Sequence, residues 1–164
     1  MATQVQFRRG TTSQHGSFTG AVGEVTVDTD KDTVVVHDGS QAGGFAIPNL
    51  KTAQEFTKTQ NFNATTLSDA STIAWDASSN QVAKVTLGGN RTLGAATNQV
   101  DGAVYVLTVI QDGTGGRTLS FNANYKFTGG SAPTLTTTAS ATDVIVFLSN
   151  GSNMLEIGRS LNVS

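Results

Sequence analysis

The 164-residue chain contains no cysteine, which excludes disulfide bridges, zinc–thiolate sites and a thiol nucleophile. It has only two prolines, so a proline-rich disordered linker is also excluded. Without covalent staples or a cysteine-bound metal, the chain depends for its stability on packing within itself or against other copies.

Charged residues are scarce: they make up 13% of the chain, and the formal net charge is −2 at pH 7. A nucleic-acid partner is not expected, because binding to phosphates requires a surplus of Lys and Arg. The most apolar run, Ala103 to Ile110, is too short to span a bilayer, so no membrane partner is expected. There is no phosphate-binding loop motif, and we expect no cofactor.

Val, Thr and Phe alternate with polar residues between Gly- and Asn-rich turns, a pattern that predicts an all-β protein. In the first third of the chain, Val25 and Val27 fall on one face of a strand, and Thr33 to Asp38 forms the next strand. The four residues between them are polar. This pattern predicts a β-hairpin with an acidic turn at its tip.

The acidic turn raises the alternative of a calcium site, because Asp28, Asp30 and Asp32 fall at every second position. A helix–loop–helix calcium loop that starts at Asp28 needs Gly at its sixth position and Glu at its twelfth. Thr33 and Gly39 stand there instead. A solvated polar turn is therefore favoured, and we expect no metal site.

From Thr66 onward, strand patterns recur every 8–12 residues or so, a spacing typical of a sandwich or barrel. The pattern predicts an antiparallel β-sandwich or jelly roll, with a Gly-rich hairpin leading into Thr118 to Phe121 and another hairpin turn at Ser149 to Ser152. The expected strands are 72–76, 82–87, a short one at Leu93, 103–111, 118–121, 143–149 and 153–158.

The composition divides the chain into three parts. Residues 1–48 are expected to form an N-terminal module, 49–65 a connector, and 66–164 a C-terminal β-sandwich. Leu50, Ala53 and Phe56 have helical spacing, which predicts one short helix in the connector. A staple-free β module of under about 60 residues is marginally stable alone, so its alternating valines need another surface to pack against.

Candidate ligand contacts are Tyr125 and Phe127, in the loop-like stretch "NANYKFTGG", although a core position is the alternative for each. Trp75 shares a strand face with Ile73 and is predicted to lie in the core. His15 and His37 have no nucleophile motif near them, so neither is expected to act in catalysis.

An enzyme is not expected. Polysaccharide cleavage by paired carboxylates is the one alternative that the sequence leaves open, because Glu24, Glu55 and Glu156 are distant in sequence and could still meet in the fold. Such enzymes generally have a long β-helix or a large barrel, and neither is predicted here.

Three motifs in order, Arg8 to Thr12, Gly23 to Asp28 and Val34 to Gly39, resemble the N-terminal module of the major tropism determinant family of tailed-phage fibre proteins. The resemblance covers about the first 48 residues. It implies a homotrimer in which three hairpins pack about an axis as in a β-prism. The trimer interface is then expected at the alternating valines Val25, Val27, Val34 and Val36.

The resemblance implies a structural protein on the virion surface, whose partners are its own copies and a phage capsid or tail protein. Residues 1–48 are then expected to be the trimerisation or attachment module, and residues 66–164 the sandwich that is displayed outward. The stretch between Pro48 and Thr66 is too short for a long shaft, which favours a capsid decoration protein or short head fibre. The alternative is a tail-fibre receptor-binding protein that recognises a host surface glycan or protein.

Overall fold

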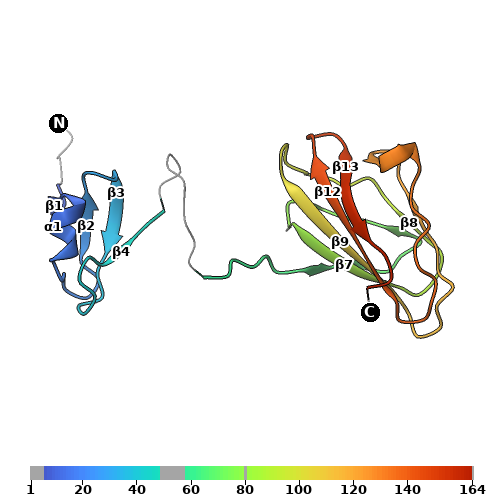
Figure 1. Ribbon diagram of the computed structural model, residues 1–164, viewed down its shortest axis with the longest axis horizontal. Helices are drawn as coiled ribbons and strands as arrows, with labels where there is room; N and C mark the ends of the chain where they lie inside the picture. The colour runs from blue at the N-terminus through green and yellow to red at the C-terminus, as the bar shows by residue number, and fades with distance from the viewer. Residues whose placement is uncertain (1–5, 49–57, 80, 164) are drawn as a thin grey trace. The chain divides into compact units, whose positions relative to one another are not determined.

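The computed structural model describes residues 6–48, 58–79 and 81–163 and divides the chain into two compact units, 1–60 and 61–164 (Figure 1). The division falls inside the stretch predicted to be the connector. The short helix predicted around Leu50, Ala53 and Phe56 lies outside the described residues. Within the described part of the chain, no helix has the length and apolar character needed to cross a membrane.

The N-terminal unit is a four-stranded sheet with one short helix beside it. The sheet order is β1-β2-β3-β4. These elements are β1 (Arg9–Gly10), α1 (Thr12–Gly16), β2 (Val25–Asp28), β3 (Thr33–Val36) and β4 (Phe45–Ala46). The predicted hairpin is confirmed, because β2 and β3 pair antiparallel with Val25 opposite Val36 and Val27 opposite Val34.

Helix α1 was not predicted from the sequence. It begins with a capping box: the Gln14 amide donates to the Thr11 hydroxyl at 3.2 Å, and the Thr11 amide donates to Gln14 Oε1 at 2.8 Å. Five residues are too few for a helical pattern to be recognised. A helix this short also depends on contacts from elsewhere in the fold.

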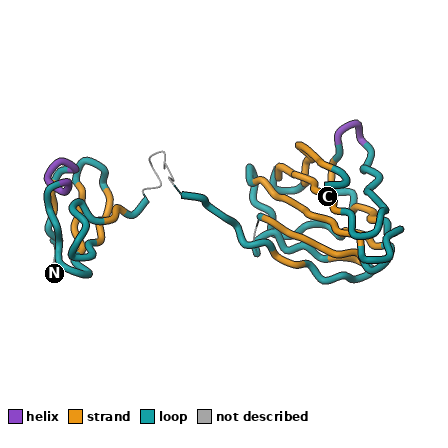
Figure 2. The backbone as a smooth tube through the Cα atoms, turned by 60° about the horizontal axis from the view of Figure 1, so that its bottom comes forward, coloured by secondary structure: helices purple, strands orange, loops and turns teal. Residues whose placement is uncertain are grey.

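The C-terminal unit contains a six-stranded sheet, β11-β13-β12-β9-β7-β5, and a three-stranded sheet, β10-β8-β6. Figure 2 shows strands throughout this unit and helix only at η1 (Thr128–Gly130). The strands are β5 (Thr65–Thr66), β6 (Thr72–Ile73), β7 (Val82–Leu87), β8 (Arg91–Leu93), β9 (Val104–Gln111), β10 (Leu119–Phe121), β11 (Tyr125–Lys126), β12 (Thr142–Ser149) and β13 (Met154–Ser160). The prediction of an all-β protein is confirmed.

Strand directions differ from the expected antiparallel sandwich. From β5 to β10 the chain alternates between the two sheets, so the neighbours β5-β7-β9 and β6-β8-β10 run parallel. Within the described residues of the C-terminal unit, only β12 pairs antiparallel, with β9 on one side and β13 on the other. The Gly-rich hairpin predicted before Thr118 is wrong, because β10 pairs with β8 in the second sheet and not with β9. The hairpin turn at Ser149 to Ser152 is confirmed.

The core of this unit lies between the two sheets, because buried side chains from both form one cluster. Trp75 and Ile73 are both in it, as predicted, with 1% and 0% of their surface exposed. The Trp75 ring meets Tyr105 edge to face, with centroids 6.0 Å apart. Removing large aromatic and aliphatic side chains from water in this way is the main force that holds such a unit together.

Candidate functional site

Four valines of the β2–β3 hairpin point away from the interior of the N-terminal unit. Val34 and Val36 are 38% and 37% exposed, and Val25 and Val27, directly opposite them, are half-buried. Successive side chains of a strand point to opposite faces, so Val35, with 2% exposure, points inward. The structure therefore gathers all four predicted interface valines on one outward face.

Strand β4 and the residue after it enlarge this face with two side chains, Phe45 and Ile47, that the sequence did not predict. Phe45 lies opposite Val36, and the Ile47 amide donates to the Val34 carbonyl at 2.8 Å. Their side chains therefore stand beside those two valines, and they are 56% and 51% exposed. The large apolar residues at alternate positions of "FAI" were the sequence signal that could have predicted these two outward side chains. We call the following set the hairpin face: Val25, Val27, Val34, Val36, Phe45 and Ile47.

The opposite side of the sheet buries a hydrogen-bonded chain of two histidines and a threonine. The Gly20 amide donates to His37 Nδ1 (3.3 Å), so His37 carries its proton on Nε2, which donates to Thr26 Oγ1 (2.9 Å). The Thr26 hydroxyl then donates to His15 Nε2 (2.8 Å), and His15 Nδ1–H donates to the Thr11 carbonyl (3.0 Å). Both ring nitrogens of each histidine and the Thr26 hydroxyl thus have hydrogen-bond partners. Both histidines therefore take part in the packing of this unit.

Two glycines leave room for the His37 ring. A Cβ at Gly20 would lie 2.5 Å from His37 Cγ, and one at Gly44 would lie 2.7 Å from its Nδ1. Gly44 also has a φ of +59°, which favours glycine. The polar interior of this unit is therefore closely packed around His37.

The acidic turn holds the helix against the hairpin. Asp28 is buried and accepts hydrogen bonds from the Thr12 hydroxyl at 2.7 Å and from the amides of Asp30 and Lys31 at 3.0 and 3.2 Å. Burial raises the pKa of Asp28, but these hydrogen bonds outweigh it, so the pKa lies below its ordinary value. Among the described residues, no group of three or more His, Cys, Asp or Glu side chains is arranged to hold a metal ion.

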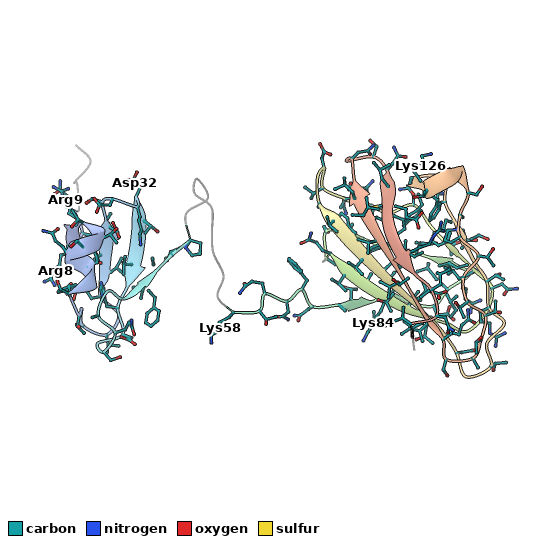
Figure 3. All side chains as sticks on the ribbon, viewed as in Figure 1. Arg8, Arg9, Asp32, Lys58, Lys84 and Lys126 are labelled. Carbon is teal, nitrogen blue, oxygen red and sulfur yellow. The ribbon has the colours of Figure 1, made fainter. Side chains whose placement is uncertain are left out.

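A shallow depression of about 240 Å³ lies beside α1, where Figure 3 shows Arg8 and Arg9. Arg8 forms an ion pair with Glu24 at 2.9 Å and stacks over the Phe18 ring at 4.9 Å. Its charge is thus already paired within the chain. The depression is lined by Arg8, Arg9, Gly10, Gln14, His15, Phe18 and Thr26.

The two aromatic candidates of the C-terminal unit are not surface platforms. The expectation that this stretch exposes its aromatic rings is wrong for Tyr125, which is 4% exposed and donates from its hydroxyl to the Gly94 carbonyl at 3.1 Å. Burial raises the pKa of Tyr125. Phe127 is half-buried and packs edge to face against Phe121 and Phe147. Strand β11, which places Tyr125 over the core, is only two residues long and is set by its pairing with β13.

Two of the glutamates considered for catalysis lie in the described part of the chain, and they are engaged separately. Glu24 belongs to the N-terminal unit and pairs with Arg8, whereas Glu156 belongs to the C-terminal unit and pairs with Arg159 at 3.2 Å. Glu55 lies outside the described residues.

Comparison with known proteins assigns both units. Residues 48–154 match the family described as "Putative phage tail fibre C-terminal domain", and residues 5–41 match the "Major tropism determinant N-terminal domain". A tail fiber receptor-binding protein of Bordetella phage BPP-1 is 41% identical over 143 residues, which cover 80% of this chain and 36% of that protein. The chain thus spans little more than a third of the length of this curated relative.

Two solved structures are also similar. The major tropism determinant I1 variant is 69% identical over 27% of this chain and 12% of its own, with a TM-score of 0.27. The U1 variant is 31% identical over 88% of this chain and 38% of its own, with a TM-score of 0.30. With the two matching domains in order, the chain belongs to the "Putative phage tail fibre C-terminal domain" family and is a phage fibre protein with a major tropism determinant-like N-terminal domain.

Proposed function

We propose that this protein is a non-enzymatic, homotrimeric tail-fibre component that binds a host surface glycan or protein. The family match over 48–154 and the relative named a receptor-binding protein support the tail fibre. They favour a tail-fibre receptor-binding protein over the capsid decoration protein or short head fibre, which was expected because the stretch between Pro48 and Thr66 is too short for a long shaft. A fibre can be assembled from several proteins, so a short connector in one of them does not decide between head and tail.

The observation that carries the trimer is the hairpin face. It places six apolar side chains on one side of a small sheet, four of them more than a third exposed. Burial of apolar surface contributes about 25 cal/mol per Å². Three copies that pack their hairpin faces about a common axis remove these side chains from water. This burial stabilises a small unit that has no disulfide bridge, because the chain contains no cysteine.

In this proposal the N-terminal unit associates with its copies and joins the virion, and the C-terminal unit is presented to the host. The polar chain of His15, Thr26 and His37 gives each N-terminal unit a fixed shape before association. The well-packed core around Trp75 does the same for the C-terminal unit. A rigid, repeated domain suits recognition because several weak contacts to one cell surface then act together.

The test is the double variant Val25→Asp with Val27→Asp. It places six carboxylates per trimer at a desolvated axis, and unpaired buried charges cost several kcal/mol each. We expect a monomer by light scattering, loss of virion incorporation, and unchanged Trp75 fluorescence from the C-terminal unit. The matched control is Val22→Asp, an 82% exposed valine outside the sheet, which should remain assembled and be incorporated.

Receptor binding needs a second measurement. Purified trimer should compete with the phage for adsorption to host cells, whereas the double variant should compete far less because it is monovalent. Immunogold labelling should place the protein on the tail. Label spread over the head, or a trimer that does not compete, would contradict the proposed tail-fibre role.

A further inference from the structure

Charged side chains gather at one end of the C-terminal unit. Charged residues make up only 13% of the whole chain, yet four of them meet where β7 and β9 finish and β8 and β10 begin. Two are aspartates and two are arginines, and they come from four separate segments. We call this set the charged end: Asp69, Arg91, Asp112 and Arg117.

The four side chains form two ion pairs. Arg91 donates from Nε and Nη2 to the two carboxylate oxygens of Asp69, each at 2.7 Å. Arg117 donates from Nε and Nη2 to Oδ2 of Asp112, at 3.1 and 2.8 Å. Hydrogen bonds from these arginines hold the pKa of both carboxyl groups below its ordinary value, so both are ionised at neutral pH.

The strand register sets the two ion pairs beside each other. Strands β7 and β9 are in register up to their last residues, so Gly88 and Asp112, which follow them, are neighbours. The Gly88 amide donates to Oδ2 of Asp69 at 3.2 Å. The hydrogen bonds from Arg91 lower the pKa of Asp69, and the charge of nearby Asp112 acts against that shift. The two carboxylates are therefore close enough to act on one ligand.

Two glycines let the first ion pair lie flat against its loop. A Cβ at Gly89 would lie 2.5 Å from Nη1 of Arg91, and a Cβ at Gly88 would lie 2.9 Å from Oδ2 of Asp69. The loop thus holds the guanidinium and the carboxylate in one position. All four side chains of the charged end remain between 22% and 29% exposed, so a ligand can reach them.

The charged end offers hydrogen-bond donors and acceptors side by side. A guanidinium has five N–H groups. Arg117 uses two of them on Asp112. Arg91 uses two on Asp69 and one on the carbonyl of Asn90, at 3.4 Å. The other N–H groups of both arginines have no hydrogen-bond partner among the described residues.

This arrangement matches the chemistry of a sugar. Neighbouring hydroxyl groups of a sugar both donate and accept, so they can bond to a carboxylate and to the guanidinium beside it. A few polar groups that are held in place fix the orientation of such a ligand. The two positive and two negative charges of the charged end cancel, so neither an anion nor a cation is attracted.

The charged end also lies away from the point where the chain enters this unit. Strand β5 runs parallel to β7, with Thr65 opposite Ala83 near the beginning of β7. Residues 61–64 therefore approach the unit at the opposite end from the charged end. Loops at one end of a rigid β scaffold commonly carry binding residues.

We propose that the charged end binds an uncharged glycan of the host surface, through hydrogen bonds between sugar hydroxyls and its two ion pairs. This inference rests on the host-binding role proposed above and names its site and ligand class. One such site makes few hydrogen bonds and binds weakly, and several copies in one fibre strengthen the attachment.

The probe for the test is polysaccharide extracted from the host envelope and separated by anion exchange into an uncharged and an acidic fraction. The full-length protein should bind the uncharged fraction in biolayer interferometry. Periodate oxidation of the sugars should abolish this binding. Added salt should change the affinity little, because no net charge attracts the ligand.

Two variants test the residues. Arg91→Gln and Arg117→Gln each remove charge-assisted donors and should weaken binding about tenfold or more. The matched control is Lys126→Gln, which removes one positive charge at the other end of the unit, where Figure 3 shows Lys126, and should bind normally. Circular dichroism and Trp75 fluorescence check the fold. If Arg117→Gln disturbs it, Arg117→Lys keeps the charge but not the planar fork and should also bind weakly.

Three results would overturn the site. One is normal binding of the uncharged fraction by folded variants of both arginines. Another is binding of the acidic fraction alone, abolished by salt, which would mean an anionic ligand. The third is adsorption to host cells that protease treatment of the cells abolishes and periodate does not, which would mean a protein receptor. A protein that does not adsorb to host cells at all would instead contradict the receptor-binding role itself.

Discussion

The two units of this protein are built on different interiors. In the described part of the N-terminal unit, Val35 is the one buried apolar side chain, and the other buried side chains are polar: His15, Thr26, Asp28, Thr33 and His37. The C-terminal unit buries a continuous apolar cluster that includes Trp75, Tyr105 and Phe147. A small sheet cannot enclose enough apolar surface, so it uses hydrogen bonds inside and leaves its valines outside.

This difference teaches that the fold of the N-terminal unit depends mainly on the geometry of buried hydrogen bonds. The fold of the C-terminal unit depends mainly on how well apolar side chains fill its core. The buried hydrogen bonds that link His37, Thr26 and His15 depend on one another, so a change that breaks one of them weakens the others. An apolar core instead responds to how well its space is filled. The apolar residues of the smaller unit remain available for association.

The largest effect is expected from Trp75→Ala. Truncation of a buried large aromatic costs about 3–5 kcal/mol of unfolding free energy, and it should fall on the C-terminal unit alone. Denaturant unfolding followed by circular dichroism measures the loss. The imidazole NMR signals of His15 and His37, which both belong to the N-terminal unit, should not change. Val100→Ala, at a 63% exposed position, is the control, and a similar loss there would mean that Trp75 is not a core residue.

A smaller effect on the other unit is expected from Gly20→Ala. The new Cβ would lie 2.5 Å from His37 Cγ, and overpacking of this kind typically costs about 1–3 kcal/mol. The His37 imidazole signal should shift or broaden while Trp75 fluorescence is retained. Gly16→Ala is the matched control, because no atom outside its chain neighbours and its own helix backbone lies within 4 Å of the added Cβ. An unperturbed His37 in Gly20→Ala would contradict the close packing described above.

Acid should loosen the N-terminal unit through Asp28. Its folded-state pKa is lowered, so its stabilising contribution is complete above the unfolded value of about 3.9 and is lost as the pH falls through the folded value. The amides of Asp30 and Lys31, which donate to Asp28, should lose protection from hydrogen exchange over that range. In Asp28→Asn the same amides should be less protected at neutral pH and depend less on acid; an unchanged acid response would assign it to another group.

The smallest effect is expected from a chelator. The carboxylate of Asp28 is occupied by the Thr12 hydroxyl and two amides, and Asp30 accepts the Thr12 amide at 3.0 Å. EDTA should therefore leave the Tm of both units unchanged. A large decrease that added calcium reverses would show that the acidic turn binds a metal after all.

The sequence by itself determined the features that depend on neighbouring residues. Alternation placed Val25, Val27, Val34 and Val36 on one face of a hairpin, and it placed Trp75 with Ile73 in the core. Turn residues located the hairpin at Ser149 to Ser152. The ordered motifs between Arg8 and Gly39 led to the correct family. Each of these inferences uses residues a few positions apart, where strand geometry directly relates sequence to side-chain direction.

Only the tertiary structure decided which distant strands pair and in which direction. Alternation is the same in a parallel and an antiparallel strand, so the pairing of β10 with β8 was not predictable from "DGTGGRTLSF". The burial of Tyr125 follows from the two-residue β11 docking beside β13, and helix α1 forms because Asp28 and Thr26 lie beside it. These contacts join residues far apart in sequence, and their stability comes from the shared core and the buried hydrogen bonds, which exist only once the fold is complete.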